Sequence, residues 1–120
     1  MEAQQSLIFD VGLEDFDQRV LAASADQAVL VDFWAEWCPP CIVLAPVIER
    51  VVREHAGVLR LAKLEVDEGE NMKLAGRYQV RGFPTVIIFR DGAELGRFAG
   101  AKSYTDLVAF LQRHVGPLPA

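Results

Sequence analysis

An apolar segment that runs into a cysteine pair constrains the fold of this chain more than any other feature. Residues 28–35 are apolar at every position except Asp32. A segment that is apolar on both faces is typical of a strand covered by helices on both sides. This segment leads into Cys38-Pro39-Pro40-Cys41, and apolar residues then recur at helical spacing over residues 39–55. The sequence therefore predicts a central strand that ends at the start of a long helix.

The rest of the chain alternates between strand and helix patterns. The candidate elements are a strand at residues 6–9, a helix on which Leu13, Phe16 and Val20 share a face, a strand at 59–66, a short helix ending near 76–78, strands at 85–89 and 93–98, and a last helix at 104–115 capped by Ser103. Asp91-Gly92 is a hairpin signal between the last two strands. Right-handed crossovers make the first three strands parallel and the closing hairpin antiparallel. We predict a mixed five-stranded sheet with helices on both faces.

Size and charge narrow the classes of protein. A chain of 120 residues suits a single domain, which we expect to be ordered over about residues 6–115 with short flexible ends. The formal charge of −5 and the lack of a basic run disfavour nucleic acid as a partner. The apolar runs are too short to cross a bilayer, which disfavours a membrane protein. Residues 1–6 carry an acid where an export signal is basic, so we expect a cytoplasmic protein.

Cys38 and Cys41 are the only cysteines in the chain. In a reducing compartment such a pair is more often catalytic or metal-binding than structural. Cys38 lies at the predicted helix start, which favours a thiolate, whereas Cys41 lies one turn further on the apolar face. We therefore predict a reversible dithiol with Cys38 accessible and Cys41 shielded. A structural disulfide and a metal site are the alternatives, although His55 and His114 lack the spacing of zinc ligands.

Residues 16–115 carry, in order, motifs that resemble those of the thioredoxin family: Val31-Asp32-Phe33-Trp34-Ala35-Glu36-Trp37-Cys38, Pro40-Cys41, Ala45-Pro46, Lys63, Gly82-Phe83-Pro84-Thr85, Asp91-Gly92 and Gly100. The resemblance implies an α/β thioredoxin fold with four helices around the sheet. It also implies an enzyme that reduces protein disulfides, with Cys38 as the nucleophile, Cys41 as the resolving cysteine, and no cofactor or metal besides this pair. The expected partners are protein disulfides and, as electron donor, a thioredoxin reductase; we expect a monomer.

The resemblance also implies roles for residues around the cysteines. Asp32 becomes a buried general base that acts on Cys41 through a water molecule, with Lys63 beside it. The residues alone leave open that Asp32 faces solvent and that Lys63 is an ordinary surface lysine. Phe83-Pro84 becomes a cis-proline turn against the dithiol. The motif and substrate-binding residues would be Trp37, Pro39, Pro40, Phe83, Pro84, Ala99, Gly100 and Ala101.

Two positions depart from the family pattern. Pro39 stands where the family usually has glycine, and Ile42 where a basic residue is common. Pro39 removes one backbone N–H near the thiolate, whereas its rigidity favours the disulfide, so the sign of its net effect on the redox potential stays open. Recognition by a standard thioredoxin reductase also stays open. The alternative functions are a disulfide oxidase or isomerase, and a docking module without redox chemistry.

Overall fold

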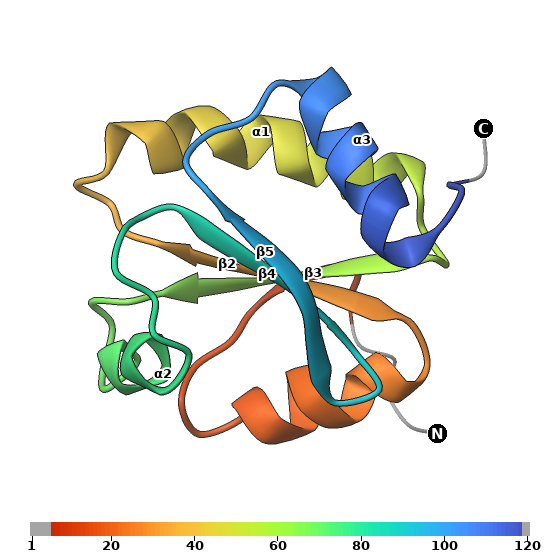
Figure 1. The fold of residues 1–120 in the computed structure, drawn as a ribbon. Helices are drawn as coiled ribbons and strands as arrows, with labels where there is room; N and C mark the ends of the chain where they lie inside the picture. The colour runs from red at the N-terminus through yellow and green to blue at the C-terminus, as the bar shows by residue number, and fades with distance from the viewer. Residues whose placement is uncertain (1–5, 119–120) are drawn as a thin grey trace.

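The computed structural model describes residues 6–118, which form one five-stranded mixed sheet with helices on both faces (Figure 1). The strands are β1 (Ile8–Asp10), β2 (Ala28–Trp34), β3 (Leu59–Glu65), β4 (Thr85–Arg90) and β5 (Ala93–Ala99). The helical segments are the π-helix η1 (Asp17–Ala22), the 3-10 turn η2 (Ala23–Ala25), α1 (Pro39–Glu54), α2 (Met72–Arg77) and α3 (Tyr104–Val115). Within the described residues, no helix is long and apolar enough to cross a membrane.

The strand order across the sheet is β1-β3-β2-β4-β5, so β2 occupies the centre. β1 and β2 both run parallel to β3, whereas β4 is antiparallel to β2 and to β5. Asp91 and Gly92 at the β4–β5 turn have φ values of 55° and 76°, the left-handed backbone that a tight hairpin requires. The predicted central strand, the parallel part and the antiparallel closing hairpin are therefore confirmed.

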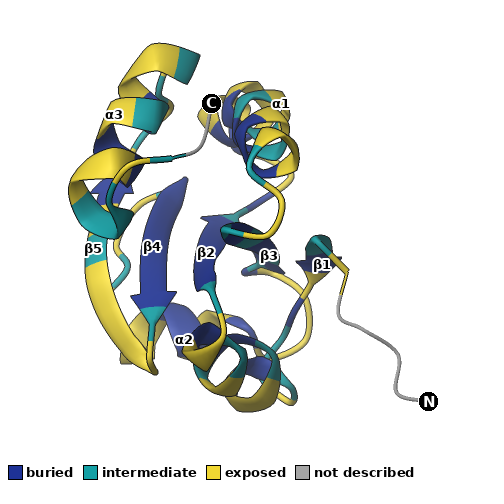
Figure 2. Cartoon of the chain, turned by 90° about the vertical axis from the view of Figure 1, so that its right-hand side faces the viewer, coloured by how far each residue is buried: buried dark blue, intermediate teal, exposed yellow. Residues whose placement is uncertain are grey.

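The side chains of β2 divide between the two faces of the sheet. Ala28 and Leu30 pack with residues of α1 and α3, whereas Val29, Val31 and Phe33 pack with residues of η1 and α2. Figure 2 shows α1 and α3 on one side of the sheet and α2 on the other. Burial on both faces explains why the sequence of this strand is almost continuously apolar.

Asp32 belongs to the face that α1 covers. Because successive side chains of a strand alternate, Asp32 shares the face of Leu30. Lys63 is the direct partner of Asp32 in the parallel pairing of β2 with β3, and it shares the face of Leu61. The sheet therefore presents a carboxyl group and an ammonium group as neighbours beneath α1.

The first helix differs from its prediction in winding. It forms as the π-helix η1 and the 3-10 turn η2 rather than as an α-helix. Phe16 and Val20 are nevertheless fully buried, as the apolar spacing predicted. Leu13, which was expected on the same face, is half-buried in the turn before η1. The flexible ends that we predicted comprise residues 1–5 and 116–120, of which residues 1–5 and 119–120 lie outside the described residues.

Candidate active site

Cys38 and Cys41 form a disulfide across the first turn of α1. Their Cα atoms lie 5.3 Å apart, within the range that a disulfide bridges. Cys38 is the N-cap of the helix, and its Sγ accepts a hydrogen bond of 3.3 Å from the N–H of Cys41. Pro39 and Pro40 fill the next two positions, where a missing N–H leaves no helical hydrogen bond unmade. The cysteine pair thus lies at the helix start, in its oxidised form.

Both cysteines are buried in this oxidised state. Cys38 is 4% exposed and Cys41 is 2% exposed, so the predicted contrast between an accessible and a shielded cysteine is wrong for the disulfide form. The Sγ of Cys38 lies 3.4 Å from the carbonyl oxygen of Phe83. Cys38 is covered by a loop that is distant in sequence, which the local helical spacing cannot reveal.

Asp32 is 1% exposed, and its Oδ1 has no hydrogen-bond partner in the described part of the chain. Burial disfavours the charged carboxylate and raises the pKa of Asp32 to about 7; Lys63 opposes this rise and Glu49 adds to it. The alternative in which Asp32 faces solvent is therefore excluded. A carboxyl group that titrates near neutrality is suited to proton transfer.

Lys63 lies beside Asp32 in the sheet, but its ammonium group is paired with a different carboxylate. Nζ of Lys63 is 2.9 Å from Oε2 of Glu49 and 5.4 Å from the centre of the Trp34 ring. Glu49 also accepts a hydrogen bond of 3.4 Å from Arg53. Glu49 was not predicted as a site residue, because it lies on the polar side of the helical pattern. Only the packing of α1 over β3 brings it to Lys63.

The loop before β4 closes over the dithiol. The Phe83–Pro84 peptide bond is cis, as the resemblance implied. The N–H of Gly100 donates a hydrogen bond of 2.9 Å to the carbonyl oxygen of Pro84, which holds the end of β5 against this loop. The rings of Phe83 and Trp37 pack edge to face with 5.9 Å between their centres. Three segments that are far apart in sequence thus meet around Cys38.

The predicted motif and substrate-binding residues, which we call the rim of the site, include both exposed and covered side chains. Trp37 is 63% exposed, and Phe83 and Gly100 are half-buried. Pro84 is buried, so it supports the loop and contributes little to the open surface, which corrects its expected place on the rim. Pro39, Pro40, Ala99 and Ala101 are also exposed.

An apolar surface continues from Trp37 along the first turns of α1. Ile42 is 54% exposed and Val43 is 62% exposed. Together with Glu36, Trp37 and Pro39, these side chains line an open hollow of about 450 Å³. We call Trp37, Pro39, Ile42 and Val43 the α1 patch. Large exposed apolar side chains that are contiguous often mark a protein interaction surface.

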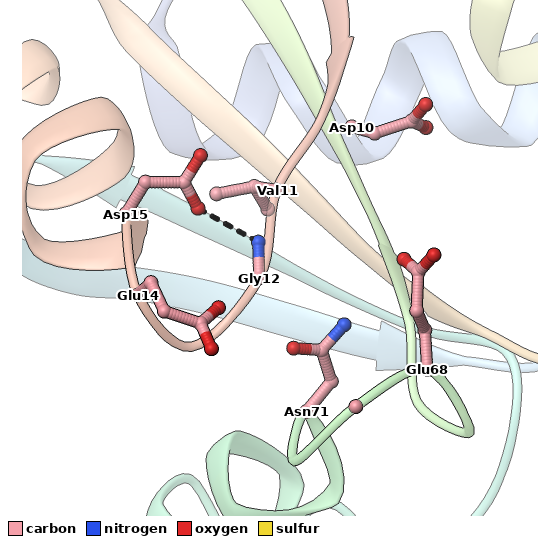
Figure 3. Close-up of a pocket in the computed structure, with 8 residues that line it drawn as sticks. Asp10, Val11, Gly12, Glu14, Asp15, Glu68 and Asn71 are labelled. Carbon is pink, nitrogen blue, oxygen red and sulfur yellow. Dashed lines mark hydrogen bonds between the residues drawn. The ribbon is translucent and has the colours of Figure 1, made fainter.

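A second hollow lies between the loop after β1 and the segment before α2 (Figure 3). Asn71, which is buried there, accepts a hydrogen bond from the N–H of Leu13 and donates one to the carbonyl oxygen of Glu65. This side chain therefore joins the two segments.

Within residues 6–118, no group of three or more His, Cys, Asp or Glu side chains is placed to hold a metal ion. The carboxylates that line this hollow belong to Asp10, Glu14, Asp15 and Glu68.

The arrangement around Cys38 can perform dithiol–disulfide exchange. A helix start stabilises a thiolate, and a second sulfur within bonding distance can displace a partner from the first. The buried carboxyl group below the helix can exchange a proton near neutral pH. The fold and the site therefore define a thiol-disulfide oxidoreductase.

Comparison with known proteins identifies the family within this class. The thioredoxin family model matches residues 8–113. The chain is 44% identical to a thioredoxin of Pseudomonas aeruginosa over 90% of this chain and 96% of that protein. It is 42% identical to a thioredoxin of Acidithiobacillus ferridurans over 87% of this chain and 93% of that protein. The chain belongs to the thioredoxin family, so the predicted fold and the predicted enzyme class are confirmed.

Proposed function

We propose that this chain reduces protein disulfides, with Cys38 as the attacking cysteine and Cys41 as the resolving cysteine. The disulfide at the N-cap of α1 is the observation that carries the proposal. In the reduced protein, the Cys41 N–H and the positive end of the helix dipole favour the thiolate of Cys38. The apolar surroundings of Cys41 favour its neutral thiol until the second step.

The reaction proceeds in two exchanges that balance in atoms and electrons. The Cys38 thiolate attacks one sulfur of the substrate disulfide, and the other substrate sulfur leaves as a thiolate. Cys41 then loses its proton and attacks Sγ of Cys38, which breaks the mixed disulfide and releases the second substrate sulfur. The substrate gains two electrons, and the chain ends with the Cys38–Cys41 disulfide.

Asp32 serves in the second exchange as the base that takes the proton of Cys41. Its burial and its pKa of about 7 support this role, because a base is most effective when its pKa lies near the working pH. A docking module without redox chemistry does not require a buried carboxyl group beneath α1, one oxygen of which has no hydrogen-bond partner among the described residues. The alternative of a non-redox binding protein is therefore less consistent with the site.

The substrate binds on the surface around Trp37. An extended substrate segment pairs with the backbone of Phe83, in the manner of strand addition, and its apolar side chains rest on the α1 patch. The indole N–H of Trp37 donates a hydrogen bond to Asp67, which orients the ring at the edge of the site. An oxidised chain is recharged by a reductase, for which a thioredoxin reductase is our candidate. We further propose a cytoplasmic monomer that consists of one domain.

Insulin reduction with dithiothreitol as the electron source tests this proposal. The parent chain should accelerate the precipitation of reduced insulin chains, and Cys38→Ser should lose this activity. Cys41→Ser should instead accumulate a mixed disulfide with the substrate through Cys38, detected by mass spectrometry of the intact complex. Turnover by Cys38→Ser at the parent rate would contradict the assigned roles.

The equilibrium of the dithiol with glutathione distinguishes a reductase from an oxidase or isomerase. A reductase should remain largely oxidised at glutathione ratios that reduce a strongly oxidising disulfide. A Cys38–Cys41 disulfide that is reduced as readily as those of oxidases would favour the alternative function.

A further inference from the structure

An ion pair joins Glu49 of α1 to Lys63 of β3, next to the buried Asp32. We propose that Glu49 is a positioning residue for the exchange reaction. By holding the ammonium group of Lys63, Glu49 keeps that group from pairing with the carboxyl group of Asp32. The effect of Glu49 on turnover rests on the proposed function of Asp32 as a base. The effect of Glu49 on the ionisation of the Asp32 carboxyl group does not depend on that function.

The contacts of Lys63 are the first support for this proposal. Asp32 and Lys63 are direct partners in the β2–β3 pairing, so their backbones are as close as neighbouring strands allow. A lysine beside a buried carboxyl group without a hydrogen bond would ordinarily pair with it. Nζ of Lys63 is instead 2.9 Å from Oε2 of Glu49, and Oδ1 of Asp32 has no partner among the described residues.

The Glu49–Lys63 ion pair is partly buried, so solvent screens its charges only in part. The side chains of Glu49 and Lys63 are 22% and 21% exposed, whereas the other ion pair of Glu49 reaches Arg53, whose side chain is 62% exposed. Partly buried charges are screened less by water and salt than exposed ones. The ring of Trp34 lies 5.4 Å from Nζ of Lys63, so the ammonium group has a second favourable contact away from Asp32.

The charges that act on Asp32 come from two elements. β3 contributes Lys63, which lowers the pKa of Asp32, and α1 contributes Glu49, which raises it. β4 contributes Val86, an apolar residue, as the direct neighbour of Asp32. Cys38 and Cys41 do not titrate while they form the disulfide.

Loss of Glu49 therefore acts on Asp32 twice in the same direction. It removes a negative charge that opposes ionisation of Asp32, and it frees Lys63 to favour that ionisation. Loss of Lys63 acts in the opposite direction. Opposite shifts of Asp32 after loss of Glu49 and of Lys63 are expected from their opposite charges alone. The holding of Lys63 is therefore tested by comparing Glu49→Gln, which keeps a hydrogen-bond acceptor for Lys63, with Glu49→Leu, which does not.

Titration of the Asp32 carboxyl carbon by NMR in the oxidised protein tests the inference directly. We expect Glu49→Gln to lower the midpoint of the Asp32 titration by about one pH unit. Glu49→Leu also removes the hydrogen-bond acceptor of Lys63, so it should lower the midpoint further. Lys63→Met should raise the midpoint. An unchanged or higher midpoint in both Glu49 variants would overturn the inference.

Glu54→Gln is the matched control, because it removes the same charge from the same helix. Glu54 pairs with Arg50 and Tyr104 rather than with Lys63, so the Asp32 midpoint should match that of the parent. A shift equal to that of Glu49→Gln would show a general effect of helix charge and would contradict the specific role of Glu49.

The pH profile of mixed-disulfide release connects this inference to the reaction. In Glu49→Gln, the pH at which release accelerates should fall together with the Asp32 midpoint, because the base ionises at lower pH. A pH profile identical to that of the parent would show that Glu49 does not influence mixed-disulfide release. If the parent chain fails to reduce insulin, the proposed function is refuted. The effect of Glu49 on the Asp32 titration, measured by NMR, would not be affected by that failure.

Discussion

Asp32 makes the stability of this protein depend on pH. Its pKa is raised from an ordinary value of 3.8 to about 7 by burial. Between these two values the folded chain retains a proton that the unfolded chain has lost, so the free energy of unfolding falls as the pH rises. A tenfold difference in proton affinity corresponds to about 1.4 kcal/mol, so the loss approaches roughly 4 kcal/mol above pH 7.

Asp32→Asn should remove this pH dependence. We expect the variant to exceed the parent in free energy of unfolding by up to about 4 kcal/mol at pH 8, relative to their difference at pH 4. Urea denaturation at the two pH values measures this change. Asp26→Asn, at an exposed position, is the control and should show no such change. Parallel pH dependences of the parent and Asp32→Asn would contradict the assigned cause.

Pro39 removes a hydrogen-bond donor at the helix start beside Cys38, the proposed attacking cysteine. With proline at the first two positions of α1, the N–H of Cys41 is the hydrogen-bond donor to Sγ of Cys38. Pro39→Gly restores one N–H and should lower the pKa of the Cys38 thiol by about one pH unit. Ultraviolet absorbance of the thiolate during a pH titration measures this change. An unchanged or higher thiol pKa would count against the donor argument.

At the scale of elements, Gly96 sets how closely β5 approaches α3. A Cβ atom at Gly96 would overlap the imidazole ring of His114. That ring is fixed, because its Nδ1 lies 2.9 Å from the carbonyl oxygen of Phe110 and its centre lies 4.4 Å from the centre of the Phe110 ring. A side chain at position 96 would therefore force the His114 ring or α3 to shift.

Gly96→Ala should lower the free energy of unfolding by about 1–3 kcal/mol through overpacking. His114→Ala removes the overlapping ring, so most of this cost should disappear when both changes are combined. A double-mutant cycle by urea denaturation measures the coupling. If the two changes lower the free energy of unfolding additively, the cost of Gly96→Ala does not arise from overlap with the His114 ring.

At the scale of the whole molecule, the α1 patch and the dithiol share one surface. Trp37 belongs to both, since its ring packs against Phe83 of the loop and borders the hollow beside Ile42. A large substrate can bury the patch while its disulfide reaches Cys38, whereas a small disulfide cannot. Protein substrates should therefore depend on the patch more strongly than small ones.

Ile42→Lys should reduce kcat/KM for insulin roughly fivefold, equivalent to about 1 kcal/mol of lost apolar contact. The rate with a small aromatic disulfide should stay close to that of the parent. Leu95→Lys on β5 is the control, because Leu95 is also exposed but lies outside the patch. Equal losses for both substrates would place the effect at the dithiol and not in docking.

The sequence by itself determined the order of the elements, the central place of β2 and the cysteine pair at the start of α1. These features follow from local patterns: residues 28–35 are apolar on both faces, Asp91-Gly92 suits a tight turn, and Cys38 precedes a helical repeat. Each pattern acts within a few residues, so it can be read without knowledge of the packing. The helical spacing of Phe16 and Val20 predicted their burial for the same reason.

Only the tertiary structure decided the surroundings of the site. The contact of Cys38 with the Phe83 carbonyl, the burial of Pro84 and the pairing of Lys63 with Glu49 all join segments that are far apart in sequence. The local sequence shows that a position is polar or apolar, but not which distant group will face it. The partner of Lys63 and the environment of Asp32 therefore depend on how α1 lies across the sheet.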